Sequence, residues 1–233
     1  MAITEANLTS AADTTDATSW TTASITPTTN RLVLAAICNS RATSPTLPTL
    51  SGCGLTWVQV ATVAYVSDTR RLTLFRALGA SPTSGALTID FAGVTQSAAG
   101  WVISEYDGID TSGTDGSAAI VQSVTDNSGA GVGTTASATL AAFGAAENAT
   151  FGMFNVNNAS GFTAGSGFAE GGDVNVSGLG SLMAEWRNDN DTSVDATMTS
   201  GNWGAIAAEI KAAPATQPSD NPPIGFLGRG AGW

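Results

Sequence analysis

The side chains best suited to chemistry in this sequence are carboxylates close to aromatic residues. Glu105 and Asp107 stand two positions apart in a segment that begins with Trp101, and Glu185 directly precedes Trp186. A glycoside hydrolase uses two such carboxylates, and an aromatic ring can support the sugar. The alternative is structural, with Asp107 opening a turn and Glu105 on a solvent-facing strand surface. Because spacing alone does not make a catalytic cleft, we expect no catalytic residue and no enzymatic activity.

A second candidate site is the acidic run between Asn188 and Asp195. Asp189, Asp191 and Asp195 offer oxygen ligands at alternating positions, which suits Ca²⁺. The run lacks the glycine and the distal glutamate of an EF-hand loop. A polar turn between two strands is the simpler interpretation, so we expect no metal site.

The sequence contains no histidine, and this excludes Ser-His-Asp and Cys-His triads and histidine-ligated zinc. It also lacks the Gly-Lys-Ser/Thr of a phosphate-binding loop. The two cysteines, Cys38 and Cys53, are too few for a metal site. They are either reduced thiols, as in a cytoplasmic protein, or partners in a disulfide formed after release from the cell. We therefore expect no cofactor.

The chain of 233 residues is acidic, with a net charge of −11 and only 8 Lys and Arg residues. Nucleic-acid binding requires basic residues that neutralise phosphates, so neither nucleic acid nor an anionic membrane is an expected partner. The first residues lack the basic segment and apolar run of a secretory signal. The longest apolar run, Leu32–Cys38, is too short to span a bilayer. These features predict a protein that is made in a cytoplasm and stays in solution.

Hydrophobic residues alternate with small polar residues along most of the chain, which indicates β-strands. Arg31–Cys38 is nearly all apolar, as expected for a central buried strand. The segments 72–78 and 87–91, joined by a turn at 79–85, are predicted to form an antiparallel hairpin. Trp203–Lys211 is rich in Ala, but its alternation favours a strand over a helix. Further strands are predicted at 55–66, 101–106, 118–124, 135–143, 150–156, 182–187 and 194–198.

About ten strands without a helical period predict an all-β fold, an antiparallel β-sandwich of jelly-roll type with extended terminal arms. We find no internal repeat of fixed period, and the Gly-rich segment 157–180 is the longest expected loop. The predicted division is an N-terminal arm and first strand at 1–30, a sandwich body at 31–212, and an extended tail at 213–233.

The tail begins with prolines and ends in an apolar peptide interrupted by glycines. Prolines keep a chain extended and glycines disfavour its folding on itself, so this segment cannot form its own core. An apolar end on a polar stalk is suited to docking on another protein. The residues expected to make that contact, with Arg229 for a partner's carboxylate, are Pro222, Pro223, Ile224, Phe226, Leu227, Arg229 and Trp233.

Three segments carry a resemblance to a known group of proteins: Gly54–Val58, Arg71–Leu78 and Trp101–Asp110. Together they resemble small β-sandwich structural proteins of tailed bacteriophages, over about residues 31–211. Proteins of that kind are virion components, such as capsid decoration (cement) proteins or head fibres, and decoration proteins often form trimers. The resemblance implies a structural protein on the outer capsid surface, made in the host bacterial cytoplasm. It would bind the major capsid protein or other virion proteins and form a homo-oligomer, with a trimer favoured.

Two alternative functions remain open at this point. The first is a tail or fibre adhesin module that binds host surface glycans through loops bearing tryptophan, of which the chain has six. The second is a glycan-degrading enzyme that uses Glu105, Asp107 or Glu185.

Overall fold

A computed structural model describes residues 2–214, which form sixteen β-strands and one 3-10 turn, η1 (Ser117–Ala119). Every strand pairing within them is antiparallel, which confirms the all-β sandwich. The finer jelly-roll description stays a prediction. No helix in this part of the chain is long and apolar enough to cross a bilayer.

The strands form four sheets. One five-stranded sheet has the order β1 (Thr4–Asp13), β8 (Ala98–Asp107), β3 (Leu32–Ser40), β6 (Arg70–Ala77) and β5 (Val58–Tyr65). The other has the order β13 (Ala169–Val176), β14 (Gly180–Arg187), β11 (Ala149–Val156), β16 (Trp203–Ile210) and β9 (Ile120–Asn127). The three-stranded sheets are β2 (Ser19–Thr21), β7 (Thr88–Asp90) and β4 (Thr49–Ser51), and β10 (Gly133–Thr139), β15 (Ser193–Gly201) and β12 (Phe162–Thr163).

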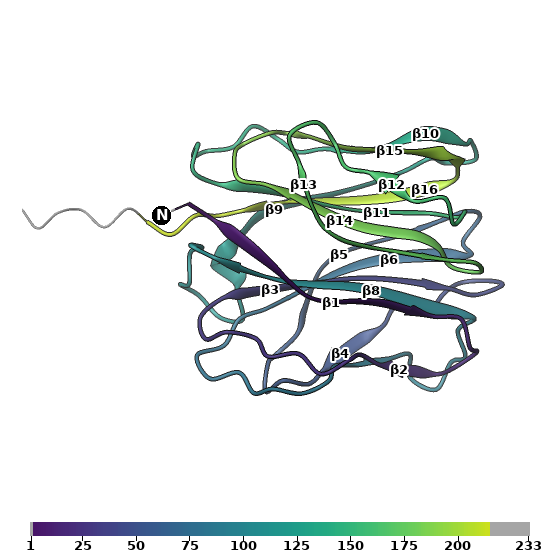
Figure 1. The fold of residues 1–233 in the computed structure, drawn as a ribbon, viewed down its shortest axis with the longest axis horizontal. Helices are drawn as coiled ribbons and strands as arrows, with labels where there is room; N and C mark the ends of the chain where they lie inside the picture. The colour runs from purple at the N-terminus through teal and green to yellow at the C-terminus, as the bar shows by residue number, and fades with distance from the viewer. Residues whose placement is uncertain (1, 215–233) are drawn as a thin grey trace, which may run out of the picture.

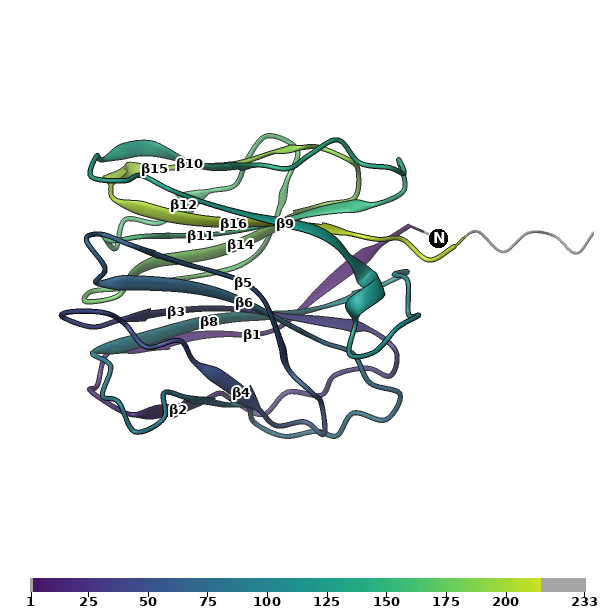
Figure 2. The ribbon, with the colours of Figure 1, turned by 180° about the vertical axis from the view of Figure 1, so that it is seen from behind.

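The four sheets stack in layers, with the two five-stranded sheets in the middle and a three-stranded sheet outside each of them (Figure 1 and Figure 2). Three apolar cores separate the layers. We call them the central core, between the five-stranded sheets, the first outer core, beneath β2, β7 and β4, and the second outer core, beneath β10, β15 and β12.

The run predicted as a central buried strand is β3, and all nine of its residues are buried. Its alternate side chains enter two different cores: Leu34 faces the central core, whereas Val33 and Ile37 face the first outer core. A strand covered on both faces needs apolar residues at every position, which is why this segment shows no alternation.

The two halves of the chain share one topology. The order β1-β8-β3-β6-β5 in the first half is repeated as β9-β16-β11-β14-β13 in the second, and β2-β7-β4 is repeated as β10-β15-β12. The halves also pack reciprocally, since β1 lies on β13 as β9 lies on β5, and β8 lies on β14 as β16 lies on β6. The protein is therefore two eight-stranded sandwiches related by an approximate two-fold axis.

Two matched glycines mark this repeat. Gly100 on β8 lies opposite Cys38 of β3, and Gly204 on β16 lies opposite Asn155 of β11. A Cβ atom on Gly100 would lie 2.5 Å from Leu179 of the other half, and a Cβ atom on Gly204 would lie 2.7 Å from a ring carbon of Tyr65. Each half thus uses a glycine to admit a large side chain from its partner half.

Residues 2–30, predicted as an N-terminal arm and first strand, all belong to the folded body. β1 pairs with β8 along nearly its whole length, and Ile3 is buried in the central core. Trp20 is buried in the first outer core, where its ring meets Phe91 edge to face at 5.6 Å. The predicted first strand is therefore present, but the Thr- and Ala-rich composition of β1 did not define its bounds, because its side chains are mostly half-buried.

The predicted hairpin between residues 72–78 and 87–91 is wrong. β6 pairs with β3 and β5 in a five-stranded sheet, whereas β7 pairs with β2 and β4 in the outer sheet. The connection crosses from one layer to the other instead of turning back. Alternation shows that each segment has a buried face, but it does not identify the sheet to which the segment belongs.

The Gly-rich segment 157–180 is not a single long loop, because it contains β12 and β13. The register of β13 against β14 shifts between Glu170 and Gly172, and Gly172 has a φ of +141° at this bulge. A side chain rarely adopts that φ, so the bulge requires glycine, and the glycines hide the strand pattern.

Candidate functional site

Both ends of the described chain meet at one end of the sandwich. β8 and β16 both finish there, and Figure 1 shows the N-terminus beside the last described residues. The Asp110 N–H donates to the Lys211 carbonyl at 2.9 Å, and the Ala213 N–H donates to the Gly108 carbonyl at 2.8 Å. Lys211–Ala213 is thus held against the connection between the halves. We call this region the terminal end.

An ion pair reinforces this attachment, because the Lys211 ammonium lies 2.8 Å from the Asp110 carboxylate. The hydrogen bond from Lys211, followed by those from Ser112, lowers the pKa of Asp110 to about 2. Lys211 is half-exposed, so solvent weakens the pair, and we assign it about 1 kcal/mol. The root of the C-terminal segment is therefore fixed to the body by backbone and side-chain bonds.

Two of the carboxylates singled out in the sequence, Glu105 and Asp107, have structural partners at the terminal end. Glu105 is nearly fully buried and accepts hydrogen bonds from the Thr28 N–H at 2.7 Å and the Thr28 hydroxyl at 2.9 Å. Arg31 donates to Glu105 at 2.7 Å and to Asp107 at 3.2 Å. Glu105 does not lie on a solvent-exposed face as the structural alternative supposed; it is held between a cation and a loop.

The second half has a matching carboxylate, Glu209. Glu105 lies opposite Val33 on β3, and Glu209 lies opposite Thr150 on β11. Arg31 and Asn148 stand at corresponding places, each two residues before those partners. The Asn148 amide donates to Glu209 at 2.5 Å, and the Gln122 amide donates to it at 2.6 Å. A cation therefore neutralises the first carboxylate, whereas neutral amides hold the second.

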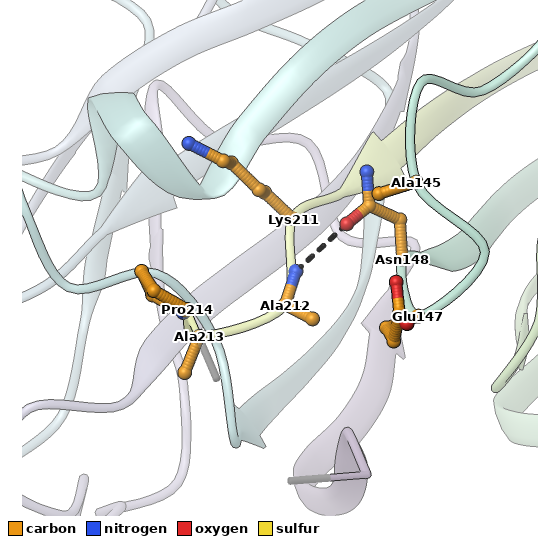
Figure 3. Close-up of a pocket in the computed structure, with 7 residues that line it drawn as sticks. All are labelled: Ala145, Glu147, Asn148, Lys211, Ala212, Ala213 and Pro214. Carbon is orange, nitrogen blue, oxygen red and sulfur yellow. Dashed lines mark hydrogen bonds between the residues drawn. The ribbon is translucent and has the colours of Figure 1, made fainter. Parts of the chain in front are cut away.

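Two adjoining cavities of about 440 and 430 Å³ open at the terminal end, and Glu209 lines the second of them. They share Ala145, Asn148 and Lys211, and we call them together the terminal groove. Figure 3 shows one part of it, where the side-chain Oδ1 of Asn148 accepts the Ala212 N–H and the Lys211 side chain points away from Asn148. Its remaining lining residues are Ser117, Ala118, Ile120, Val121, Gly144, Glu147, Glu209, Ala212, Ala213 and Pro214.

The apolar part of the terminal groove includes Val121, which is 52% exposed. Only two other large hydrophobic residues of the described chain are comparably exposed, Leu47 and Val132. Pro214, the last described residue, lies on the rim of this groove.

The predicted docking residues, Pro222 to Trp233, lie outside the described residues. No motif in the sequence predicted the groove beside Lys211–Pro214. A signal was present in Glu209, the one charged residue in an otherwise apolar strand. A carboxylate in a strand predicted to be buried needs partners, and its position marks a polar site within the fold.

Glu185 lies in a different part of the molecule, on the face of β14 that meets the second outer core. It is fully buried, and one carboxylate oxygen accepts the Gly165 N–H at 2.9 Å, while Oε1 has no hydrogen-bond partner. Burial, with a smaller contribution from Asp195, raises its pKa to about 8. The structure therefore does not bring Glu185 together with Glu105 and Asp107.

The acidic run 188–195 is organised around Arg187 rather than around an open ligand cage. Arg187 lies 2.6 Å from Asp189 and 2.8 Å from Asp191. Its guanidinium provides the positive charge that a Ca²⁺ ion would otherwise supply. Within residues 2–214 no group of three or more acidic or cysteine side chains has the arrangement of a metal site.

The two cysteines are both buried free thiols. Cys38 faces the central core and Cys53 the first outer core, on opposite sides of one five-stranded sheet. The sheet therefore prevents a disulfide between them, and of the two possibilities the structure has reduced thiols. Burial raises the pKa of Cys38 to about 12, which keeps this thiol protonated and unreactive.

The described tryptophans are covered to different degrees. Trp20, Trp101 and Trp203 are buried, and Trp57 and Trp186 are half-buried against the cores. None of the five offers a fully exposed ring for stacking on a sugar. No protein-family model matches this chain, and no curated protein matches its sequence.

Proposed function

We propose that this chain is a non-enzymatic structural protein of a phage virion, held on the outer capsid surface by its C-terminal segment. The partner is the major capsid protein or another virion protein, and the assembled form is an oligomer. The resemblance of the three sequence segments suggests the setting. The observation that carries the proposal is the firm attachment of Lys211–Ala213 to the connection between the halves.

That attachment allows a docking segment to transmit force to the folded body. If the end of the last strand were frayed, a pulling force would unfold it. Here Lys211 and Ala213 are instead hydrogen-bonded to Gly108, Asp110 and Ala119. The acidic chain also suits a position outside the shell, because packaged DNA repels a protein with a net charge of −11.

Deletion of residues 215–233 tests this function. We expect the truncated protein to keep the circular dichroism spectrum and melting temperature of the full chain, because every strand and core of residues 2–214 remains. It should fail to join particles in a sedimentation assay. A control chain with a Gly/Ser segment of equal length separates loss of the docking residues from loss of length. Normal incorporation of the truncated protein would sink the proposal.

The number of copies in each virion distinguishes a shell component from an adhesin. Hundreds of copies support decoration of the capsid, and a few or a few dozen support a tail or fibre module. The covered tryptophans of the described chain do not favour the glycan-binding alternative.

A further inference from the structure

The two matched carboxylates of the terminal end, Glu105 and Glu209, differ in whether a cation is paired with them, and this difference suggests a ligand for Glu209. Glu105 has Arg31 at 2.7 Å, whereas Glu209 has no cationic partner among the described residues. Lys211 lines both parts of the groove, but its ammonium is paired with Asp110. The second half thus contains the carboxylate of the repeat without its cation.

A buried carboxylate held only by amides has a stronger attraction for a cation than an exposed one. Glu209 is 1% exposed, so little water competes for its charge. Glu209 nevertheless belongs to the lining of the 430 Å³ cavity, so the groove reaches this residue. A guanidinium is the group best matched to a carboxylate, as Arg31 demonstrates in the first half.

The surface beside Glu209 determines what should accompany that cation. Ile120, Val121 and Ala145 supply an apolar wall next to the carboxylate. The complementary ligand is a peptide with an arginine one or two residues from large apolar side chains. The chain contains such a peptide in its own C-terminal segment, Phe226-Leu-Gly-Arg229. Arg229 is also the only basic residue after Lys211.

We propose that the terminal groove receives residues 224–229 of the C-terminal segment of a second copy of this chain. The Arg229 guanidinium lies on Glu209, in the role that Arg31 has toward Glu105. Phe226 and Leu227 cover Ile120 and Val121. The contact rests on the proposed function and takes the second of its partners: the virion protein that residues 224–229 bind is a neighbouring copy of this chain.

A second copy is favoured over the same chain by the length and composition of the connection. The groove begins at Pro214, where its own C-terminal segment leaves the body. Residues 215–223 include Pro218, Pro222 and Pro223, and an extended chain of this kind advances about 3.1 Å per residue. If extended, these nine residues span about 28 Å, which is long enough for residues 224–229 to reach the groove of a neighbour. Such a head-to-tail contact builds rings or open chains.

Disulfide trapping between two differently tagged full-length chains tests the contact. One chain carries Ala145→Cys in the groove, and the other carries Gly228→Cys beside the anchors, so both Val121 and Leu227 are kept. The matched control replaces Ala145→Cys with Ala130→Cys, also an exposed alanine, in the loop that begins at Ser128 beside the start of β16. The native thiols are buried and do not compete.

We expect the groove pair to form mixed disulfides at least about tenfold faster than the control pair, and Arg229→Glu in the second chain to remove most of that advantage. Arg229→Lys should remove less of it, because the charge is kept. Equal rates for the two pairs overturn the proposal. So does a chain carrying both Ala145→Cys and Gly228→Cys that closes only on itself when mixed with tagged copies.

The cross-linking experiment tests the groove contact, and the particle assay tests the proposed function, so either hypothesis can be wrong while the other holds. If no cross-link forms but the truncated chain still cannot join particles, the proposed function stands and the groove is not the receptor. If the cross-link forms but the truncated chain joins particles normally, the copies associate through the groove and the segment is not the capsid anchor.

Discussion

Glu185 should make the stability of this protein fall as the pH rises through neutrality. Its carboxyl has a pKa near 8 in the fold and an ordinary value of 4.5 when exposed. Between these pH values the folded chain keeps a proton that the unfolded chain has released. The stabilisation is therefore complete below about pH 4.5 and is lost as the pH rises, by at most about 1.4 kcal/mol per pH unit. The loss over the whole range is at most about 4–5 kcal/mol.

Urea denaturation of the wild-type chain and of Glu185→Gln at about pH 5, 6, 7 and 8 measures this effect. Gln keeps an acceptor for the Gly165 N–H, but its NH₂ group would replace Oε1, which has no hydrogen-bond partner. The variant should therefore be less stable at pH 5, by about 1–3 kcal/mol.

The decisive quantity is how the difference in unfolding free energy between the wild-type chain and Glu185→Gln changes with pH. The variant should gain on the wild-type chain by at least about 2 kcal/mol between pH 5 and pH 8, since it has no proton to release. Glu147→Gln removes one exposed carboxylate as a control for the altered net charge. Parallel stability curves for the wild-type chain and Glu185→Gln would refute the assignment of the pH dependence to this residue.

Further predictions concern the terminal end and the thiols. Asp110→Asn should lower the free energy of unfolding by about 1 kcal/mol at neutral pH, measured by urea denaturation, because it breaks the pair with Lys211. The pKa of Asp110 is lowered to about 2 in the fold, so the stabilisation of the fold by this carboxylate is present above about pH 4 and is lost as the pH falls toward 2. A stability difference between the wild-type chain and Asp110→Asn that persists at about pH 2 would contradict this. Cys38 and Cys53 should react with a thiol reagent only after denaturation, and mild oxidation should leave the electrophoretic mobility unchanged; rapid labelling of the folded chain would contradict their burial.

The strands most visible in the sequence are those with the simplest burial. β3 is apolar throughout because two cores cover it, and β16 was recognised as a strand although its Ala content suits a helix. A first strand was predicted within residues 1–30, but the bounds of β1 were not, because Thr and Ala at half-buried positions give a weak alternation. Local pattern therefore identified strands but not their sheet, since pairing partners far apart in the sequence decide the layer.

The internal repeat of the fold has no fixed period in the sequence. Val33 corresponds to Thr150, Leu72 to Leu182 and Glu105 to Glu209, and the spacing within these pairs shrinks along the chain. Loops of different length produce this drift, so the topology repeats without a constant interval. The partner of Glu105 could not be predicted from local sequence either. Arg31 is distant from Glu105 in the sequence and meets it only because β3 and β8 are neighbours in the sheet.

Joining two sandwiches in one chain changes how the body responds to dilution. In a dimer of separate sandwiches the central core would open at low concentration, but here its two faces are held at a high effective concentration by the connection at residues 108–119. The fusion also frees the halves from strict identity. One half has a closed end, where Arg31 pairs with Glu105, and the other has an open groove beside Glu209, so a nearly symmetric body has two unlike halves at its terminal end.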